Sequence, residues 1–174
     1  MLNFNTKKKL LIKYIPFIFT LLLSLISSTI QPPQGYALTF SFIPLICILF
    51  WSLVLGRVFG PIQILFIGLI TDLLMGTPLG SYLLLFSIIR FISLKVKEKF
   101  NIKFFYENIL AASILIVIFY VLNNLFILIY YSKILTSEYL VLNIISTILL
   151  YPVFSVFFYW INNFASIEKT HVES

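Results

Sequence analysis

The sequence contains few charged residues. They occupy 10% of the 174 positions, whereas apolar residues occupy 61%. Soluble domains average about 25% charged residues, so this composition excludes an ordinary soluble domain. The apolar residues form runs that reach the roughly 18–20 residues needed to cross a bilayer. We therefore expect one all-α integral membrane domain over residues 1–174 and no separate soluble domain.

Residues that build redox and metal sites are also scarce. Cys47 is the only cysteine and lies in an apolar run, where a packed side chain is expected rather than a reactive thiol. His171 is the only histidine, which argues against a zinc or haem site. The chain has no Walker loop, GxSxG, HExxH or CxxC motif. We expect no enzyme activity, no cofactor and no metal.

The apolar runs predict six membrane spans. Pro44 predicts a kink in the second span, and Pro152 lies inside the sixth. The third span is short, since its 15 residues extend about 22 Å against a hydrocarbon core of roughly 30 Å. With the fourth span it should form a tight antiparallel hairpin that packs against protein rather than lipid. The predicted spans are about 14–30, 36–55, 61–75, 79–94, 109–131 and 139–161.

The basic residues predict the orientation of these spans. With six spans, 11 of the 12 basic residues fall on the side of both termini, and only Lys133 falls on the other. Basic residues accumulate in cytoplasmic loops, so both termini should be cytoplasmic. The net charge of +6 is then explained by topology and by attraction to anionic lipid, without nucleic acid. The 11 residues are Lys7, Lys8, Lys9, Lys13, Arg57, Arg90, Lys95, Lys97, Lys99, Lys103 and Lys169.

The segment 68–80, GLITDLLMGTPLG, contains the one acid deep inside an apolar run, Asp72. Four-residue spacing places Gly68, Asp72 and Gly76 on one face of a helix. Small residues allow close approach of two membrane helices, and a buried carboxylate makes a polar contact there. The candidate helix-contact and turn residues are Gly68, Asp72, Gly76, Pro78 and Gly80.

Several roles are open to Asp72. It is either a polar contact between helices, a proton or ligand site, or a cap of the nearby turn through Thr77 and the amides before Leu79. A proton relay needs a second ionisable group at depth, and the nearest one, Arg90, is expected to extend to the cytoplasmic surface. We therefore favour a contact or turn-fixing role.

Other polar positions are weaker candidates. Asn123, Asn124 and Asn143 interrupt the fifth and sixth spans, and we expect hydrogen bonds between helices there, with a ligand-lining role as the alternative. The longest polar loop is predicted after the fourth span, and it contains Lys95, Lys97, Lys99 and Lys103 with Glu98 and Glu107. It is either a solvated segment beside the lipid or a docking surface for a cytoplasmic partner.

The helix after Pro44 that ends near Phe50-Trp51, with the segment 68–80, resembles the rod shape-determining protein MreD family. The resemblance implies a bacterial inner-membrane scaffold of the cell-elongation machinery. Its partners would be MreC, MreB-type filaments and the membrane proteins of peptidoglycan synthesis. It also implies a fold related to the substrate-binding subunits of energy-coupling-factor transporters. A small-ligand-binding subunit of a vitamin-type transporter is the alternative function, and a lipid-handling protein is a third.

Overall fold

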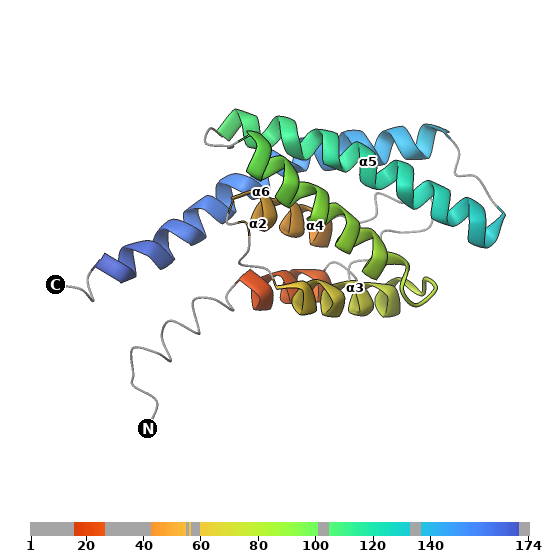
Figure 1. Ribbon diagram of the computed structural model, residues 1–174, viewed down its shortest axis with the longest axis horizontal. Helices are drawn as coiled ribbons and strands as arrows, with labels where there is room; N and C mark the ends of the chain where they lie inside the picture. Colours follow the sequence, from red (N-terminus) through yellow and green to blue (C-terminus); the bar gives the residue numbers. More distant parts are fainter. Residues whose placement is uncertain are drawn as a thin grey trace, which may run out of the picture.

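The computed structural model describes residues 16–26, 43–54, 56, 60–100, 105–132 and 137–170. All the regular structure in these residues is α-helical (Figure 1). A short segment, Pro16–Ile26, is followed by α2 (Ile43–Val54), α3 (Pro61–Met75), α4 (Ser81–Phe100), α5 (Phe105–Tyr131) and α6 (Ser137–Thr170). The all-α prediction is confirmed. The remaining parts of the predicted spans 14–30 and 36–55 lie outside the described residues.

The core is built around α2. This helix carries a single polar side chain, Ser52, and every residue from 44 to 53 is buried. A helix that is apolar on all sides belongs either in a protein core or across a membrane, and α2 is in the core, where it contacts α4, α5 and α6. At its C-terminal end the rings of Phe50 and Trp51 lie 5.1 and 5.5 Å from the ring of Phe158 on α6. The Phe-Trp pair is therefore a core element.

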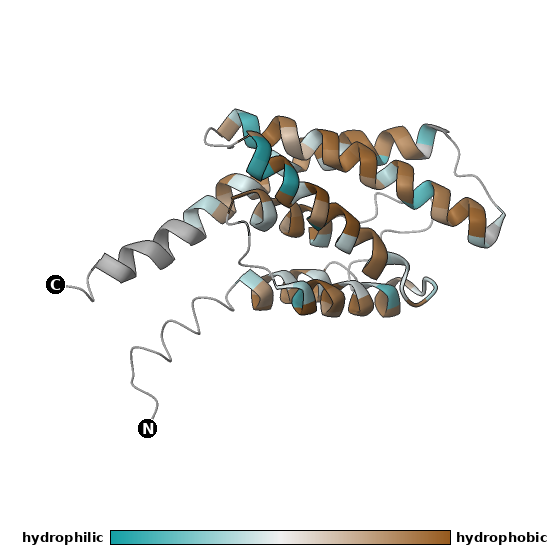
Figure 2. Ribbon diagram, in the orientation of Figure 1, coloured by the Kyte–Doolittle hydropathy of each residue, from teal (hydrophilic) through white to brown (hydrophobic). Residues whose placement is uncertain are grey.

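The predicted hairpin of α3 and α4 is present, but the expectation that it packs against protein rather than lipid is not met within this chain, because only one face of α3 is buried. The outer face of α3 is apolar, with Ile62 75% and Phe66 58% exposed. Its inner face, against α4, buries Thr71 and Asp72. Soluble proteins place apolar side chains inside and charges outside, so this arrangement fits a lipid environment. Figure 2 shows mostly hydrophobic residues along α3 and α5, and hydrophilic ones at the C-terminal end of α4.

The helices α5 and α6 form a long pair. Tyr120 and Thr147 join them by a 3.0 Å hydrogen bond between their hydroxyl oxygens, and the hydroxyl of Tyr151 donates to Asn108 Oδ1 at 3.1 Å. Within them, Phe105–Tyr130 and Leu140–Trp160 are long and apolar enough to cross a membrane. The other apolar helices among the described residues, Pro16–Ile26, α2 and α3, are shorter.

Two sequence predictions about these helices are wrong. Pro44 makes no kink, because α2 begins at Ile43 and a proline in the first turn lacks an N–H that the helix does not need. The stretch 95–100 is helix rather than loop, since α4 continues to Phe100. Lysine and glutamate are good helix formers, and lysines in the last turn complement the helix dipole. The helices α5 and α6 extend beyond the predicted spans, since they begin at Phe105 and Ser137 and α6 continues to Thr170.

Candidate functional site

The carboxylate of Asp72 lies between the end of α3 and the start of α4. It is fully buried and accepts four hydrogen bonds. Its Oδ1 accepts from the hydroxyls of Thr77 (2.9 Å) and Ser81 (2.8 Å) and from the backbone N–H of Tyr82 (2.9 Å). Its Oδ2 accepts from the N–H of Gly80 at 2.9 Å. The first amides of a helix have no partner within the helix, and a negative charge there is favoured by the helix dipole. Asp72 therefore caps α4 from the preceding helix.

The backbone of Asp72 also ends its own helix. Its carbonyl accepts from the N–H groups of Gly76 and Thr77, the latter at 3.2 Å. Gly76 has φ +63° and Gly80 has φ +102°, a region in which side chains with a Cβ are strained. Between them, the carbonyl of Pro78 accepts from the N–H of Ser81 at 3.1 Å. One residue thus terminates α3 with its main chain and begins α4 with its side chain.

Gly68 has a different role from the glycines of the turn. A Cβ at Gly68 would lie 2.4 Å from the Cα of Leu83 and 2.8 Å from its backbone nitrogen. The backbones of α3 and α4 therefore touch at this point, one turn before Asp72. Gly68 and Asp72 face α4 together, whereas Gly76 lies beyond the last helical residue, Met75. The expectation of one helical face for all three residues holds only for the first two.

A pocket of about 250 Å³ lies between this turn, α4 and α5. Its wall includes the residues 77–81, Tyr82 and Leu84 on one side, and Asn123, Phe126 and Tyr130 on the other. No hydrogen bond joins the amide of Asn123 or the hydroxyl of Tyr82 to another described residue. The pocket is therefore mainly apolar and contains two polar groups with unused hydrogen-bonding capacity.

The three predicted asparagines lie in different surroundings. Asn123 lines the pocket, Asn124 has an interaction elsewhere, and Asn143 on α6 is buried with its carbonyl accepting from Thr147 Oγ1 at 2.7 Å. The structure uses Asn108 and the hydroxyls of tyrosines for bonds between α5 and α6. The signal for Asn108 was its position at the start of an apolar run, where a polar side chain must find a partner.

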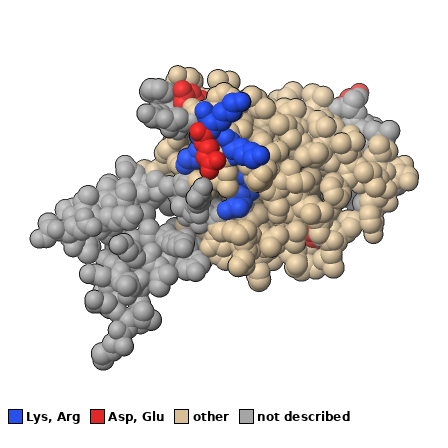
Figure 3. Space-filling model, in the orientation of Figure 1, with Lys and Arg blue, Asp and Glu red and all other residues tan. Residues whose placement is uncertain are grey.

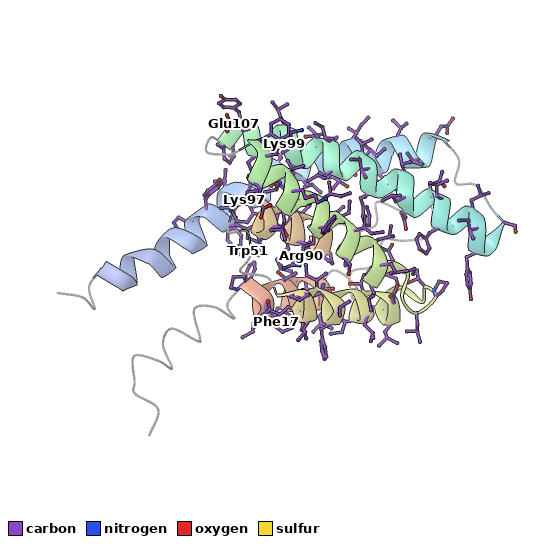
Figure 4. All side chains as sticks on the ribbon, viewed as in Figure 1. Phe17, Trp51, Arg90, Lys97, Lys99 and Glu107 are labelled. Atoms are coloured by element: carbon purple, nitrogen blue, oxygen red, sulfur yellow. The ribbon has the colours of Figure 1, made fainter. Side chains whose placement is uncertain are left out.

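A second cap, which sequence reasoning missed, lies at the other end of the bundle. The ammonium of Lys97 on α4 donates to the carbonyl of Val54, the last residue of α2. Gly56 follows α2 with a φ of +68°, which favours glycine. A Cβ at this position would also lie only 3.2 Å from Lys97 Nζ. Partial burial lowers the pKa of Lys97. A cation at a helix C-terminus is stabilising. This contact is not predicted from the sequence, because Lys97 is assigned there to a loop. Figure 4 shows Lys97 and Trp51 at this same end.

Comparison with known protein families identifies the chain. Residues 8–161 match the family described as rod shape-determining protein MreD. The chain belongs to the MreD family. The match covers α2 to α5 and most of α6, and it includes the segment 68–80, so the resemblance from the sequence is confirmed. No match is found among the curated proteins or among the solved structures.

Membership of the MreD family implies a role in determining rod shape. The geometry of Asp72 suits a structural role within it, because both carboxylate oxygens are used to position the turn. Arg90, the other charged residue singled out near the membrane interior, has an interaction of its own. Among the described residues there is no group of three His, Cys, Asp or Glu side chains that would hold a metal ion.

Proposed function

We propose that this protein is a non-catalytic scaffold in the bacterial inner membrane that couples shape-determining partners to lateral peptidoglycan synthesis. The observation that carries the proposal is the α3–α4 hairpin, whose turn is built around the buried carboxylate of Asp72. Such a turn presents a defined surface for a partner. The partners would be MreC at the turn and MreB-type filaments at the opposite, basic end, together with the membrane proteins of peptidoglycan synthesis.

The proposed placement has six spans with both termini in the cytoplasm. The apolar outer face of α3 and the length of α5 and α6 support it, as does the 11 to 1 division of basic residues. Figure 3 shows that the lysines and arginines among the described residues gather over the C-terminal part of α4. In this placement the α3–α4 turn faces outward and the lysines face the cytoplasm. The relation to the fold of energy-coupling-factor substrate-binding subunits belongs to the same proposal.

The contact with MreC is proposed at the turn and in the pocket beside it. Leu79 in the turn and Tyr130 on α5 are 73% and 66% exposed, so apolar surface continues from the pocket mouth to both sides. Asn123 and Tyr82 offer hydrogen bonds that lipid tails cannot satisfy. A protein segment that brings one apolar side chain and one polar group would complement this surface.

The test fills the pocket without touching the turn. Ile127 lines the pocket, whereas its neighbour Leu128 is 40% exposed and does not. We expect Ile127→Trp to give wider or rounded cells and to reduce co-purification with MreC, while Leu128→Trp behaves as wild type. Wild-type shape and co-purification in Ile127→Trp, at equal expression, would show that the pocket is not the contact.

The same pocket is the observation to weigh for the alternative function, a small-ligand-binding transporter subunit. The pocket volume of about 250 Å³ lies below the roughly 300–1,000 Å³ of ligand pockets, and few polar groups converge on it. The family match also favours the scaffold. Native mass spectrometry of the purified protein separates the two, because a transporter subunit retains a small molecule that Ile127→Trp displaces.

A further inference from the structure

A groove of about 380 Å³ runs between α4 and α5 on the half of the bundle away from the α3–α4 turn. On α4 it is lined by Ile92, Val96 and Phe100, which are four residues apart and so form one stripe along the helix. On α5 the residues from Leu110 to Ile118 that face it are all apolar. This elongated apolar channel suits a hydrocarbon chain.

Two lysines flank the stripe on α4. Lys95 lies three residues after Ile92, and Lys99 lies three residues after Val96, so both project beside the groove on the same helix face. The ammonium of Lys95 lies 4.5 Å from the ring centroid of Phe91, and that of Lys99 lies 5.9 Å from the ring centroid of Phe100, which lines the groove. Neither lysine has a carboxylate partner among the described residues.

The acidic residues nearby do not cancel this charge. Glu98 and Glu107 each have an interaction of their own, and Glu107 lies on the α5 side of the groove. Figure 4 shows Lys99 and Glu107 at the same end of the bundle. A phosphate beside the groove is therefore favoured on the α4 edge, where Lys95 and Lys99 lie, and disfavoured on the α5 edge.

We propose that the α4–α5 groove holds one acyl chain of an anionic glycerophospholipid, whose phosphate is bound by Lys95 and Lys99. The apolar lining accounts for the chain, and the two lysines at the rim account for the headgroup. The inference goes beyond the proposed scaffold function. It rests only on the membrane placement, and it can fail while the contact with MreC stands.

The experiment uses the full-length protein in nanodiscs that contain lipids with a photoactivatable acyl chain. The probes are phosphatidylglycerol and phosphatidylcholine, and the crosslinked residues are mapped by mass spectrometry. We expect crosslinks on residues 92–100 and 110–118, about tenfold stronger for phosphatidylglycerol. The double variant Lys95→Gln/Lys99→Gln should abolish this preference, whereas Lys95→Arg/Lys99→Arg should retain it.

A second pair of variants tests the groove itself. Ala111 lines it, so Ala111→Phe should remove the crosslinks from both lipids, whereas Val121→Phe, at an exposed position outside the groove, should not. Soluble glycerol phosphate should not compete with the lipid. The proposal is overturned if the glutamine variant keeps the preference, if crosslinks persist in folded Ala111→Phe, or if glycerol phosphate competes. If Ala111→Phe does not fold, the lysine variants decide.

Discussion

Asp72 shows how one side chain can set the geometry of two helices. A carboxylate buried in an apolar setting is costly unless its lone pairs are satisfied, and here four donors satisfy them. Two of the donors are backbone amides at the start of α4, which have no other acceptor within their helix. The helix terminus therefore supplies hydrogen-bond donors to the carboxylate, and the carboxylate supplies acceptors to the free amides.

Two replacements of Asp72 should distinguish the contribution of its hydrogen-bonding oxygens to stability from that of its negative charge. Asp72→Ala leaves the amides of Gly80 and Tyr82 without acceptors and should lower the free energy of unfolding by about 3 kcal/mol. Asp72→Asn keeps one oxygen but turns an NH₂ group toward one donor, so the loss should be about 1 kcal/mol. Thermal unfolding in detergent measures both. Glu138→Gln, at an exposed position on α6, is the control, and equal stability of the alanine and asparagine variants would contradict this account.

Lys97 should stabilise the fold by capping the C-terminal end of α2. Lys97→Met keeps the apolar stem but removes the donor to the Val54 carbonyl, and it should cost about 1 kcal/mol. Lys99→Met is the matched control, because Lys99 is exposed and its ammonium lies over a phenylalanine ring. Equal unfolding midpoints for the two variants would show that the contact with Val54 adds nothing to stability.

The residue-level details were only partly predictable. Asp72 stood out because it was the one acid in its apolar run, and a cap of the turn was among its interpretations. The actual amide donors, those of Gly80 and Tyr82, follow Leu79 rather than precede it. Their direction depends on the positive φ angles of Gly76 and Gly80, which the sequence permits but does not specify.

At the level of the helices, the hairpin depends on glycines for two different reasons, which are close packing at Gly68 and a positive φ at Gly76. Substitution of each by alanine should give a graded series. Gly60→Ala should be neutral, since its φ is −68° and the nearest atom to a Cβ is 3.9 Å away. Gly76→Ala has space but a φ of +63°, so about 1 kcal/mol is expected. Gly68→Ala forces α3 away from α4 at Leu83 and should cost about 2–3 kcal/mol.

Thermal unfolding of the three variants provides the measurement. If Gly68→Ala is as stable as Gly60→Ala, the close approach at Leu83 does not limit the packing of the hairpin. If Gly76→Ala is instead the least stable of the three, the backbone of the turn matters more than the contact between the helices.

The helix bounds were predictable where the chain has strong stop signals. Pro61 and Gly76 enclose α3, and its predicted range 61–75 is the observed one. The predicted fourth span ends at residue 94, whereas α4 continues to Phe100 through a segment rich in lysine. Charged residues next to a span can continue the helix into water, since they are good helix formers once the backbone is already helical.

At the scale of the whole molecule, the two capped ends lie on opposite sides of the bundle. The Asp72 turn and the pocket share one end with the C-terminus of α5, and Lys97 shares the other with the N-terminus of α5 (Figure 1). The buried α2 lies in the core, with its C-terminal end at Lys97. The outer surface between the two capped ends is rich in exposed leucine, isoleucine and phenylalanine, as expected where lipid replaces water.

This arrangement predicts the accessibility of single cysteines. Cys47 is fully buried, so the wild-type chain should not react with a membrane-impermeant maleimide and serves as the control. Ser132→Cys, after the end of α5, should be labelled in cells with a permeable outer membrane, because six spans place it outside. Lys99→Cys should be labelled only after the inner membrane is opened. Labelling of both positions from the same side would contradict the six-span placement, and with it the assignment of the Asp72 turn to the outer surface and of the lysines to the cytoplasm.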